Sequence, residues 1–315
     1  MGKVVIAGSS NTDMIVRVPW IPGRGETVLG GTFQTAAGGK GANQAVAAAR
    51  AGATVVFMTA LGTDALGDAA LDGFRRDGIS VDLVRRVPHV PSGVALILVD
   101  ESGENSIAVA PGANSELRPE DVEPLATALE PGDVLLLQLE IPLATVEAAA
   151  RAAVRRGARI ILDPAPARPL LSSLLSLVSL ITPNETEAEQ LTGIAVTTDE
   201  GLRRAAAALH ARGVPEVLIT LGARGVFVSV AGASSIVPGF VVAAVDTTAA
   251  GDVFSGALAA ALVEGRPLAD AIGFASAAAA LSVTRMGAQP SAPGRGEIEE
   301  MKQKWRSGKV EKWKK

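Results

Sequence analysis

Asp133-Val134-Leu135-Leu136-Leu137-Gln138-Leu139-Glu140 is the stretch that decides the fold class of this chain. Its apolar residues form a nearly continuous run and do not alternate with polar ones, which predicts a strand that is buried on both faces. Such strands belong to sheets that helices cover on both sides. The run therefore predicts an α/β protein.

The rest of the chain repeats this pattern on either side of the run. Short apolar segments alternate with segments of helical periodicity, so we predict a three-layer, doubly wound, mostly parallel sheet. Ligands bind such sheets beyond the carboxyl ends of the strands. The other predicted strands are 3–9, 54–62, 159–163, 178–182 and 216–221. The predicted helices are 41–52, 66–77, 118–129, 143–156, 185–192, 199–212, 251–264 and 268–283.

Two segments depart from the βα alternation. Residues 13–36 mix β-forming residues with Pro and Gly, and residues 92–110 are typical of a hairpin that turns at 101–104. We expect them to form one small β-sheet that projects from the main domain, as a lid or a dimer surface. The predicted organisation is an α/β domain over 1–300 with this inserted sheet, followed by a basic tail over 301–315.

Composition narrows the chemistry. The 315 residues include no Cys and only two His, His89 and His210, so thiolate chemistry is excluded and a general base is expected to be a carboxylate. The net charge of −4 argues against a general nucleic-acid-binding protein. The basic residues after 301 favour a solvated, fraying terminus over a contact with membrane or nucleic acid. They are Lys302, Lys304, Arg306, Lys309, Lys312, Lys314 and Lys315.

Membrane insertion and export are not expected. The apolar runs, such as 257–263, are too short to span a bilayer. The N-terminus leads directly into the first predicted strand without a charged leader and long apolar segment. A cytoplasmic protein is therefore the expectation.

The segment Asp246-Thr-Thr-Ala-Ala-Gly-Asp252 leads into the helix predicted from 251. The unpaired N–H groups of a helix start form an anion site. A carboxylate beside an anion site repels a phosphate, unless it accepts the proton of a hydroxyl that attacks the phosphate. Alternatively, Asp252 only stabilises the helix dipole. The segment alone leaves both interpretations open.

A glycine-rich segment, Gly38-Gly-Lys-Gly-Ala-Asn43, starts another predicted helix. It lacks the spacing of a P-loop, and no dinucleotide-binding glycine motif follows the first strand. The glycines either let the backbone approach a ligand or form a tight turn.

Polar residues follow several predicted strands at the ligand-binding edge. Asn11 and Asp13 are either turn residues or a polar pair that binds vicinal hydroxyls, and Glu140, at the end of an apolar strand, needs either solvent or a ligand. Asn184 and Glu187 are either helix-capping residues or ligands for phosphate and Mg²⁺. The turn from Thr220 to Gly225 has glycines that would let a nucleotide lie against the main chain.

Four of these segments, in this order, resemble the sugar kinases of the ribokinase (PfkB) family. They are Asn11–Asp13, Gly38–Asn43, Asn184–Glu187 and Asp246–Asp252, and the resemblance extends from about residue 3 to 298. The second and the fourth are the specific motifs.

The resemblance implies roles for matching positions. Asp252 would be the catalytic base, and the N–H groups of Ala249, Ala250 and Gly251 would form the anion hole. Sugar would be bound by Asn11, Asp13, Gly39, Lys40, Gly41, Asn43, Glu140 and Asp252. ATP would be bound by Asn184, Thr220, Gly222, Gly225, Gly251 and Ser276. Mg²⁺ would be held by Asn184 and Glu187, and an activating K⁺ by Asp246, Thr248, Ser282, Arg285, Gly287 and Ser291.

The resemblance also implies an activity: ATP-dependent phosphorylation of the 5-hydroxyl of D-ribose, giving D-ribose 5-phosphate and ADP. Alternatives are a kinase for deoxyribose or a 2-keto-3-deoxy sugar acid, or a sugar- or nucleotide-binding regulator without catalysis. An acid substrate would need a cation near the sugar, and Lys40 alone lies in the sugar motifs, which favours a neutral sugar. A homodimer through the small β-sheet is expected, because an uncovered sheet invites pairing.

Overall fold

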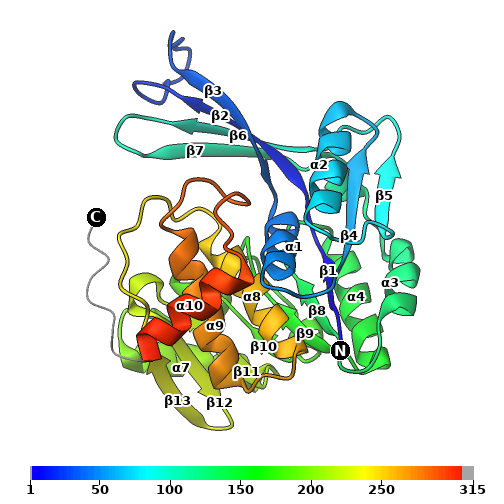
Figure 1. Ribbon diagram of the computed structural model, residues 1–315, viewed down its shortest axis with the longest axis vertical. Coiled ribbons are helices and arrows are strands. Elements are labelled where there is room, and N and C mark those ends of the chain that lie inside the picture. The colour runs from blue at the N-terminus through cyan, green and yellow to red at the C-terminus, as the bar shows by residue number, and fades with distance from the viewer. Residues whose placement is uncertain (1, 307–315) are drawn as a thin grey trace.

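The computed structural model describes residues 2–306, and its main feature is a sheet with the strand order β13-β12-β11-β10-β9-β8-β1-β4-β5. The strands from β11 to β5 are parallel, whereas β12 and β13 add to one edge as antiparallel strands. Figure 1 shows the sheet between two layers of helices, as predicted. The strands are β1 Val4–Ala7, β4 Val55–Gly62, β5 Val84–Val87, β8 Val134–Leu137, β9 Arg159–Leu162, β10 Leu180–Ile181, β11 Glu216–Thr220, β12 Val226–Val230 and β13 Ala233–Val237.

Alternate residues of the buried strands point into two separate cores. Val5 and Leu135 pack with one layer of helices, whereas Val4 and Leu136 pack with the other. This explains why the run at 133–140 shows no polar alternation. The first layer holds α3 Glu123–Ala128, α4 Leu143–Arg156, α5 Ser172–Leu175, α6 Glu185–Thr192 and α7 Asp199–Ala211. The second holds α1 Lys40–Arg50, α2 Ala65–Arg76, α8 Ala250–Val263, α9 Leu268–Ser282 and α10 Arg295–Arg306.

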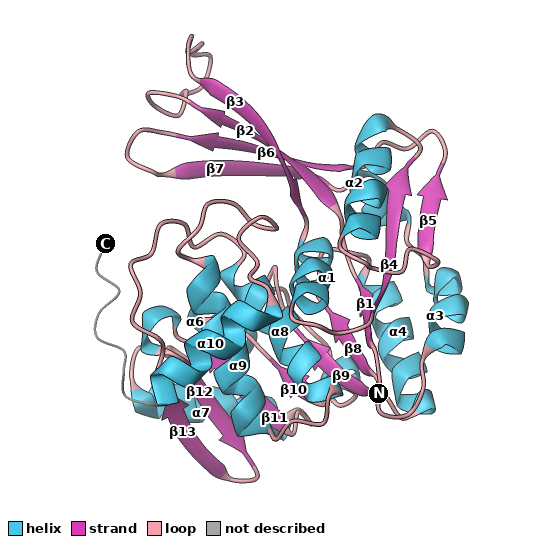
Figure 2. Cartoon of the chain, in the orientation of Figure 1, coloured by secondary structure: helices cyan, strands magenta, loops and turns pink. Residues whose placement is uncertain are grey.

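A separate sheet, which we call the lid, stands above the main sheet (Figure 2). Its strand order is β3-β2-β6-β7, and it is built from the two segments predicted to form a small sheet. β2 pairs with β3 and β6, so the segments around 13–36 and 92–110 meet along this strand. The lid strands are β2 Asn11–Arg17, β3 Thr32–Gly38, β6 Gly93–Val99 and β7 Asn105–Ala110.

Several elements differ from the sequence prediction. The predicted helix 118–129 is divided into the 3₁₀ turn Pro119–Val122 and α3, because Pro119 and Pro124 each start a new helical segment. β5, β12, β13 and α10 were not predicted. The predicted boundary between residues 300 and 301 falls inside α10, and Lys302 is buried there instead of fraying into solvent. Residues 307–315 of the predicted tail lie outside the described residues.

Between residues 2 and 306, none of the helices is long and apolar enough to cross a bilayer.

Candidate active site

Polar side chains from distant parts of the sequence meet where the main sheet adjoins the lid. They follow the carboxyl ends of β1, β8 and β9, or lie in the first turns of α1 and α8. This is the edge at which parallel α/β sheets bind ligands. The buried or half-buried members are Asn11, Asp13, Lys40, Asn43, Gln44, Glu140, Asp163 and Asp252.

Small residues bring α1 against α8. A Cβ atom on Gly256 would lie 2.5 Å from the carbonyl oxygen of Gln44 and 2.8 Å from Cβ of Ala47, so a larger residue would push the helices apart. This close crossing places the side chains of Asn43 and Gln44 against Asp252.

Asp252 is 5% exposed, and an amide group bonds to each of its carboxylate oxygens. Asn43 Nδ2 donates to Oδ2 at 2.9 Å, and Gln44 Nε2 donates to Oδ1 at 3.0 Å. Burial raises the pKa of Asp252, while Lys40 and the two amides oppose this effect. The carboxylate is thus held in a fixed orientation and has more affinity for a proton than an exposed Asp, as a general base requires.

The start of α8 provides hydrogen-bond donors beside this carboxylate. Ala249 takes the left-handed conformation with φ 58°, which begins the helix sharply. The N–H of Ala250 donates to Thr247 O at 3.2 Å, so this predicted donor of the anion hole is engaged in the turn. The N–H groups of Ala249, Gly251 and Asp252 make no hydrogen bond within the described part of the chain. These three groups are donors that remain available for an anion.

Lys40 lies among the carboxylates of the site. Its N–H donates to Glu140 Oε2 at 3.0 Å. Burial lowers the pKa of its ammonium group, but the charges of Asp252, Asp163, Glu140 and Glu187 outweigh burial and raise the pKa above its usual value. Lys40 therefore keeps its positive charge beside these carboxylates.

Asp13 is a half-buried member of the predicted sugar ligands. Burial, and then the charges of Glu140 and Asp252, raise the pKa of Asp13 to about 6. A Cβ atom on Gly38 would lie 2.4 Å from the Asp13 carboxylate oxygens, so a larger residue there would displace this carboxylate. Asn43 Oδ1 is buried without a partner in the described residues, and is available to accept a hydrogen bond from a hydroxyl group.

The other predicted sugar ligands have partners within the protein. Asn11 Oδ1 accepts a hydrogen bond from Asn114 Nδ2 at 2.8 Å. Glu140 Oε2 accepts from Ser9 Oγ as well as from Lys40 N. Gly39, at φ 88°, and Gly41 pack closely against the chain's own backbone at residues 8–11. These contacts fix the pocket before a ligand enters.

Asn184 and Glu187 form a capping box at the start of α6. Asn184 Oδ1 accepts from the N–H of Glu187, and Glu187 Oε2 accepts from the N–H of Asn184, each at 2.8 Å. The capping alternative thus describes what these side chains do in this structure. Glu187 remains half-buried and close enough to Lys40 to raise its pKa.

The turn after β11 lies beside this cap. Thr220 bridges to Asn184, and its N–H donates to Pro183 O at 2.9 Å. Gly222 and Gly225 both have positive φ. The buried Ser276 Oγ on α9 has no partner within the described residues. The predicted nucleotide residues Thr220, Gly222 and Gly225 therefore lie at the same end of the site as Asn184.

The predicted cation loop joins two segments through Asp246. Its carboxylate accepts from the N–H of Thr248 at 2.9 Å and from the N–H of Gly287 at 2.8 Å. Ser282 and Ser291 donate their hydroxyl protons to nearby carbonyl oxygens, and Arg285 pairs with Glu297. Main-chain carbonyl groups are therefore the available ligands from the second segment.

Sequence reasoning missed three residues of the site. Gln44 and Asp163 bond to each other, and Asn114 holds both Asn11 and the backbone of Ser10. Asp163 ends a predicted strand as Glu140 does, so the same rule would have found it. Gln44 follows the quoted glycine motif directly. Asn114 gave no signal, because it lies in an irregular segment far from the motifs.

A buried carboxylate beside free N–H groups and a lysine, at the ligand edge of a doubly wound sheet, defines a phosphotransferase that acts on a hydroxyl group. A family model, pfkB family carbohydrate kinase, matches residues 1–295 of the chain. The chain belongs to this family, which confirms the resemblance found in the sequence, and it is a carbohydrate kinase.

The relatives agree along almost the whole chain. Ribokinase of Haemophilus influenzae is 48% identical over 294 residues, covering 93% of this chain and 96% of the relative. Deoxyribokinase of Salmonella typhi is 38% identical over 291 residues, covering 92% of this chain and 95% of the relative. The solved structure of Arabidopsis thaliana ribokinase complexed with ribose and ATP has a TM-score of 0.89 and 36% identity, covering 96% of this chain and 99% of that chain. These matches confirm the predicted fold.

Proposed function

We propose that this carbohydrate kinase transfers the γ-phosphoryl group of ATP to the 5-hydroxyl of D-ribose, giving D-ribose 5-phosphate and ADP. The observation that carries the proposal is the Asp252 carboxylate, which two amides hold beside the free N–H groups of α8. A protein that only bound sugar or nucleotide would gain nothing from a base next to a phosphate. The names of the relatives supply the sugar and the nucleotide.

The reaction follows from the geometry. Asp252 accepts the proton of the sugar hydroxyl, and the hydroxyl oxygen forms a bond to the γ-phosphorus. The bond from this phosphorus to the bridging oxygen breaks, and its electron pair leaves with ADP. Lys40 and the N–H groups of Ala249, Gly251 and Asp252 stabilise the negative charge of the transferred group.

Two metal ions belong to the proposal. Mg²⁺ bound with ATP would supply further positive charge, with Glu187 and Asn184 holding it directly or through water. No group of three His, Asp or Glu residues within 2–306 forms a metal site, which fits an ion held largely by phosphates and water. K⁺ would bind the loop of Asp246, which anchors the turn before α8.

A neutral pentose suits the pocket better than a sugar acid. Lys40 is the one cation that we place in the sugar motifs, and the surrounding carboxylates already engage its charge. Deoxyribose lacks one hydroxyl group of ribose. A protein group that binds this hydroxyl would therefore decide between the two sugars. The higher identity to ribokinase than to deoxyribokinase favours ribose.

The test is an ADP-release assay over ribose, deoxyribose, hexoses and sugar acids, with and without K⁺. We expect the highest kcat/KM for ribose and a faster reaction with K⁺. A higher kcat/KM for deoxyribose or a sugar acid would show that ribose is not the preferred substrate. Turnover that does not depend on K⁺ would contradict the proposed cation site. Absence of turnover with every sugar would favour the regulator.

The lid is proposed to close over bound sugar. Ile107 and Val109 are 55% and 54% exposed. Their pairing with Ile97 and Ala95 places them on the same lid face as Asp13. Closure would cover them and exclude water, which otherwise hydrolyses ATP. Unchanged hydrogen exchange in both lid segments at saturating sugar would contradict this.

A homodimer through the lid is proposed from its outer face. Phe33 and Leu96 are 64% and 55% exposed, and the strand register places both on the face opposite Asp13. A second copy would cover these side chains. Sedimentation of the wild type and of Leu96→Glu tests this, with a dimer expected only in the wild type. A cytoplasmic location stays a prediction.

A further inference from the structure

Asp163 is a buried carboxyl group that the proposed reaction does not use. It is 5% exposed and follows β9, beside the catalytic carboxylate. Its Oδ2 accepts a hydrogen bond from Gln44 Nε2 at 2.6 Å. The same nitrogen donates to Asp252 Oδ1 at 3.0 Å. One amide therefore joins the catalytic acid to a second acid.

The bonds of Gln44 leave its side chain one orientation. The residue is fully buried, and its NH₂ group gives one proton to each carboxyl group. Its Oε1 accepts from Gln138 Nε2. Rotating the amide by half a turn would place its oxygen against the Asp252 carboxylate and its nitrogen against the NH₂ group of Gln138, and would lose both of these bonds.

We propose that Gln44 is a positioning residue for Asp252, with Asp163 and Gln138 as the anchors that hold its amide. The amide fixes Oδ1 of Asp252, while Asn43 fixes Oδ2. The inference rests on the proposed function, because positioning has a purpose only if Asp252 acts as the base. It gives Asp163 a role that sugar, nucleotide and cation binding leave open.

The charges around the amide support this arrangement. Burial, and then the charge of Asp252, raise the pKa of Asp163 well above its usual range, against the opposing effect of Lys40. The raised pKa favours the protonated form of Asp163, and two acids share one NH₂ group with less repulsion when one of them is neutral. Asp163→Asn imitates this neutral form and keeps the oxygen that accepts from Gln44.

The test compares steady-state kinetics of three variants. Gln44→Met keeps the length of the side chain and removes its polar atoms. It should lower kcat by about 100-fold, the effect of a misplaced reacting group, with KM for the sugar within about threefold of wild type. Asp163→Ala should lower kcat by about tenfold at unchanged KM, and Asp163→Asn should restore most of it. Gln303→Met, at an exposed position on α10, is the matched control with wild-type kinetics.

A wild-type kcat in Gln44→Met would overturn the proposal. If that variant does not fold, equal kcat values for Asp163→Ala and Asp163→Asn would overturn it. A purely structural role would lower the midpoint of thermal unfolding in parallel with kcat in both Asp163 variants, and would also count against it.

A readout without turnover separates this inference from the proposed function. The titration of the Asp252 carboxyl carbon, followed by NMR, should shift to higher pH in Gln44→Met. In the wild type the hydrogen bond from Gln44 stabilises the ionised form, and the variant loses this bond. The other charged groups facing Asp252 are Asp13 on β2, Lys40 on α1, Glu140 after β8 and Asp163 after β9. An unchanged titration refutes positioning, whereas a shifted titration in a protein that phosphorylates no sugar refutes only the proposed function.

Discussion

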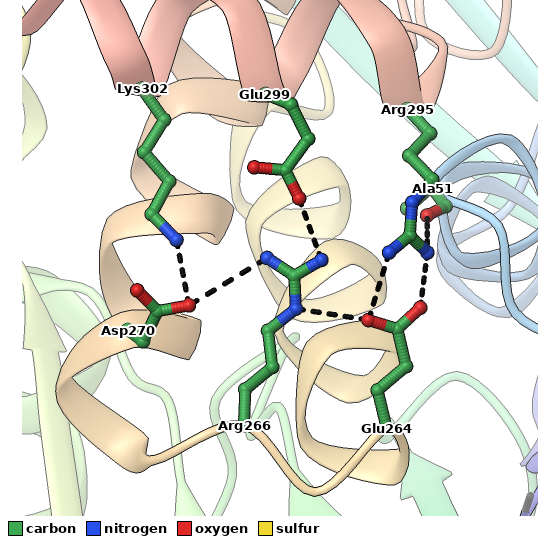
Figure 3. A network of polar contacts seen from close by, with 7 residues as sticks. All are labelled: Ala51, Glu264, Arg266, Asp270, Arg295, Glu299 and Lys302. Atoms are coloured by element: carbon green, nitrogen blue, oxygen red, sulfur yellow. Dashed lines mark hydrogen bonds and ion pairs between the residues drawn. The ribbon is translucent and has the colours of Figure 1, made fainter.

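Two clusters of charged side chains lie at opposite ends of the α1–α8 pair, and they differ in how their charges are paired. The first, which we call the α10 network, ties α10 to the segment between α8 and α9 (Figure 3). Arg266 contacts Glu264 at 2.9 Å and Glu299 at 2.6 Å, and Lys302 contacts Asp270 at 2.7 Å. With Arg295 on Glu264, each acid of the network pairs with at least one cation.

The second cluster is the active site, where four acids share one lysine. They are Glu140, Asp163, Glu187 and Asp252 around Lys40, and the charges of Glu140 and Asp252 also act on Asp13. The pKa shifts reflect this difference. The hydrogen bond from Arg295 lowers the pKa of Glu264, whereas burial raises the pKa values of Asp13, Asp163 and Asp252.

Pairing of acids with cations favours the stability of the fold, whereas an excess of buried acids lowers that stability. A site keeps such an excess only for a purpose, since buried like charges raise the free energy of the folded state. We therefore expect substitutions in the α10 network to change stability and substitutions in the active site to change catalysis.

The largest expected effect breaks the active-site half of the comparison. Asp252→Asn keeps the shape of the side chain but cannot take a proton, so kcat should fall by roughly 10²–10⁴-fold. The thermal unfolding midpoint should stay equal or rise, because a buried charge is removed. ADP release and calorimetry measure the two quantities. Turnover close to wild type would refute the mechanism.

The next effect breaks the α10 network. Glu264→Gln removes the acid that holds Arg266 and Arg295, and should lower the free energy of unfolding by roughly 2 kcal/mol, less than for a fully buried pair. The kcat of the folded enzyme should not change. Urea unfolding measures the loss, and Glu189→Gln, an exposed acid on α6, is the control. A loss equal to that of the control would mean that the network contributes nothing.

A third variant tests whether the acid excess costs stability. The pKa of Asp13 is raised from 3.8 to about 6 in the folded protein, so its favourable contribution exists below pH 3.8 and is lost as pH rises through about 6. Asp13→Asn should therefore raise the free energy of unfolding at pH 8 by about 1–2 kcal/mol after allowing for solvent screening.

Its pH dependence gives the sign. The gain of Asp13→Asn over wild type should shrink as pH falls from 7 to 4, as chemical unfolding at each pH would show. The α10 network has the opposite sign, because the lowered pKa of Glu264 makes its contribution full above pH 4.5 and lost in more acidic solution. A gain that is constant with pH would contradict the assigned cause.

The smallest effect sharpens the account of the α10 network. Arg266→Lys keeps the charge but loses the planar group that reaches several acids and lies 4.6 Å from the centre of the Phe274 ring. We expect a loss of about 1 kcal/mol in the free energy of unfolding, with unchanged kcat. Thermal unfolding measures it, and a loss larger than that of Glu264→Gln would reverse the ranking.

Much of the fold was readable from local patterns. The run at 133–140 and its counterparts gave the parallel strands, and the helices followed from their periodicity. The antiparallel edge of β12 and β13 was harder, because pairing after a turn as short as 222–225 depends on which edge of the sheet is free. α10 was missed because its many charges hide the apolar contact of Ile298 with the core.

The sequence by itself determined which chemical groups are available, since residue types and their order predict a base, an anion site and a lysine. Only the tertiary structure decided which groups share a hydrogen bond. It showed that Ala250 is engaged in a turn, that Asn184 and Glu187 cap each other, and that Gln44 links Asp163 to Asp252. The physical reason is that hydrogen bonds and pKa shifts depend on distances of a few ångströms. Packing sets those distances, here through the close crossing of α1 and α8.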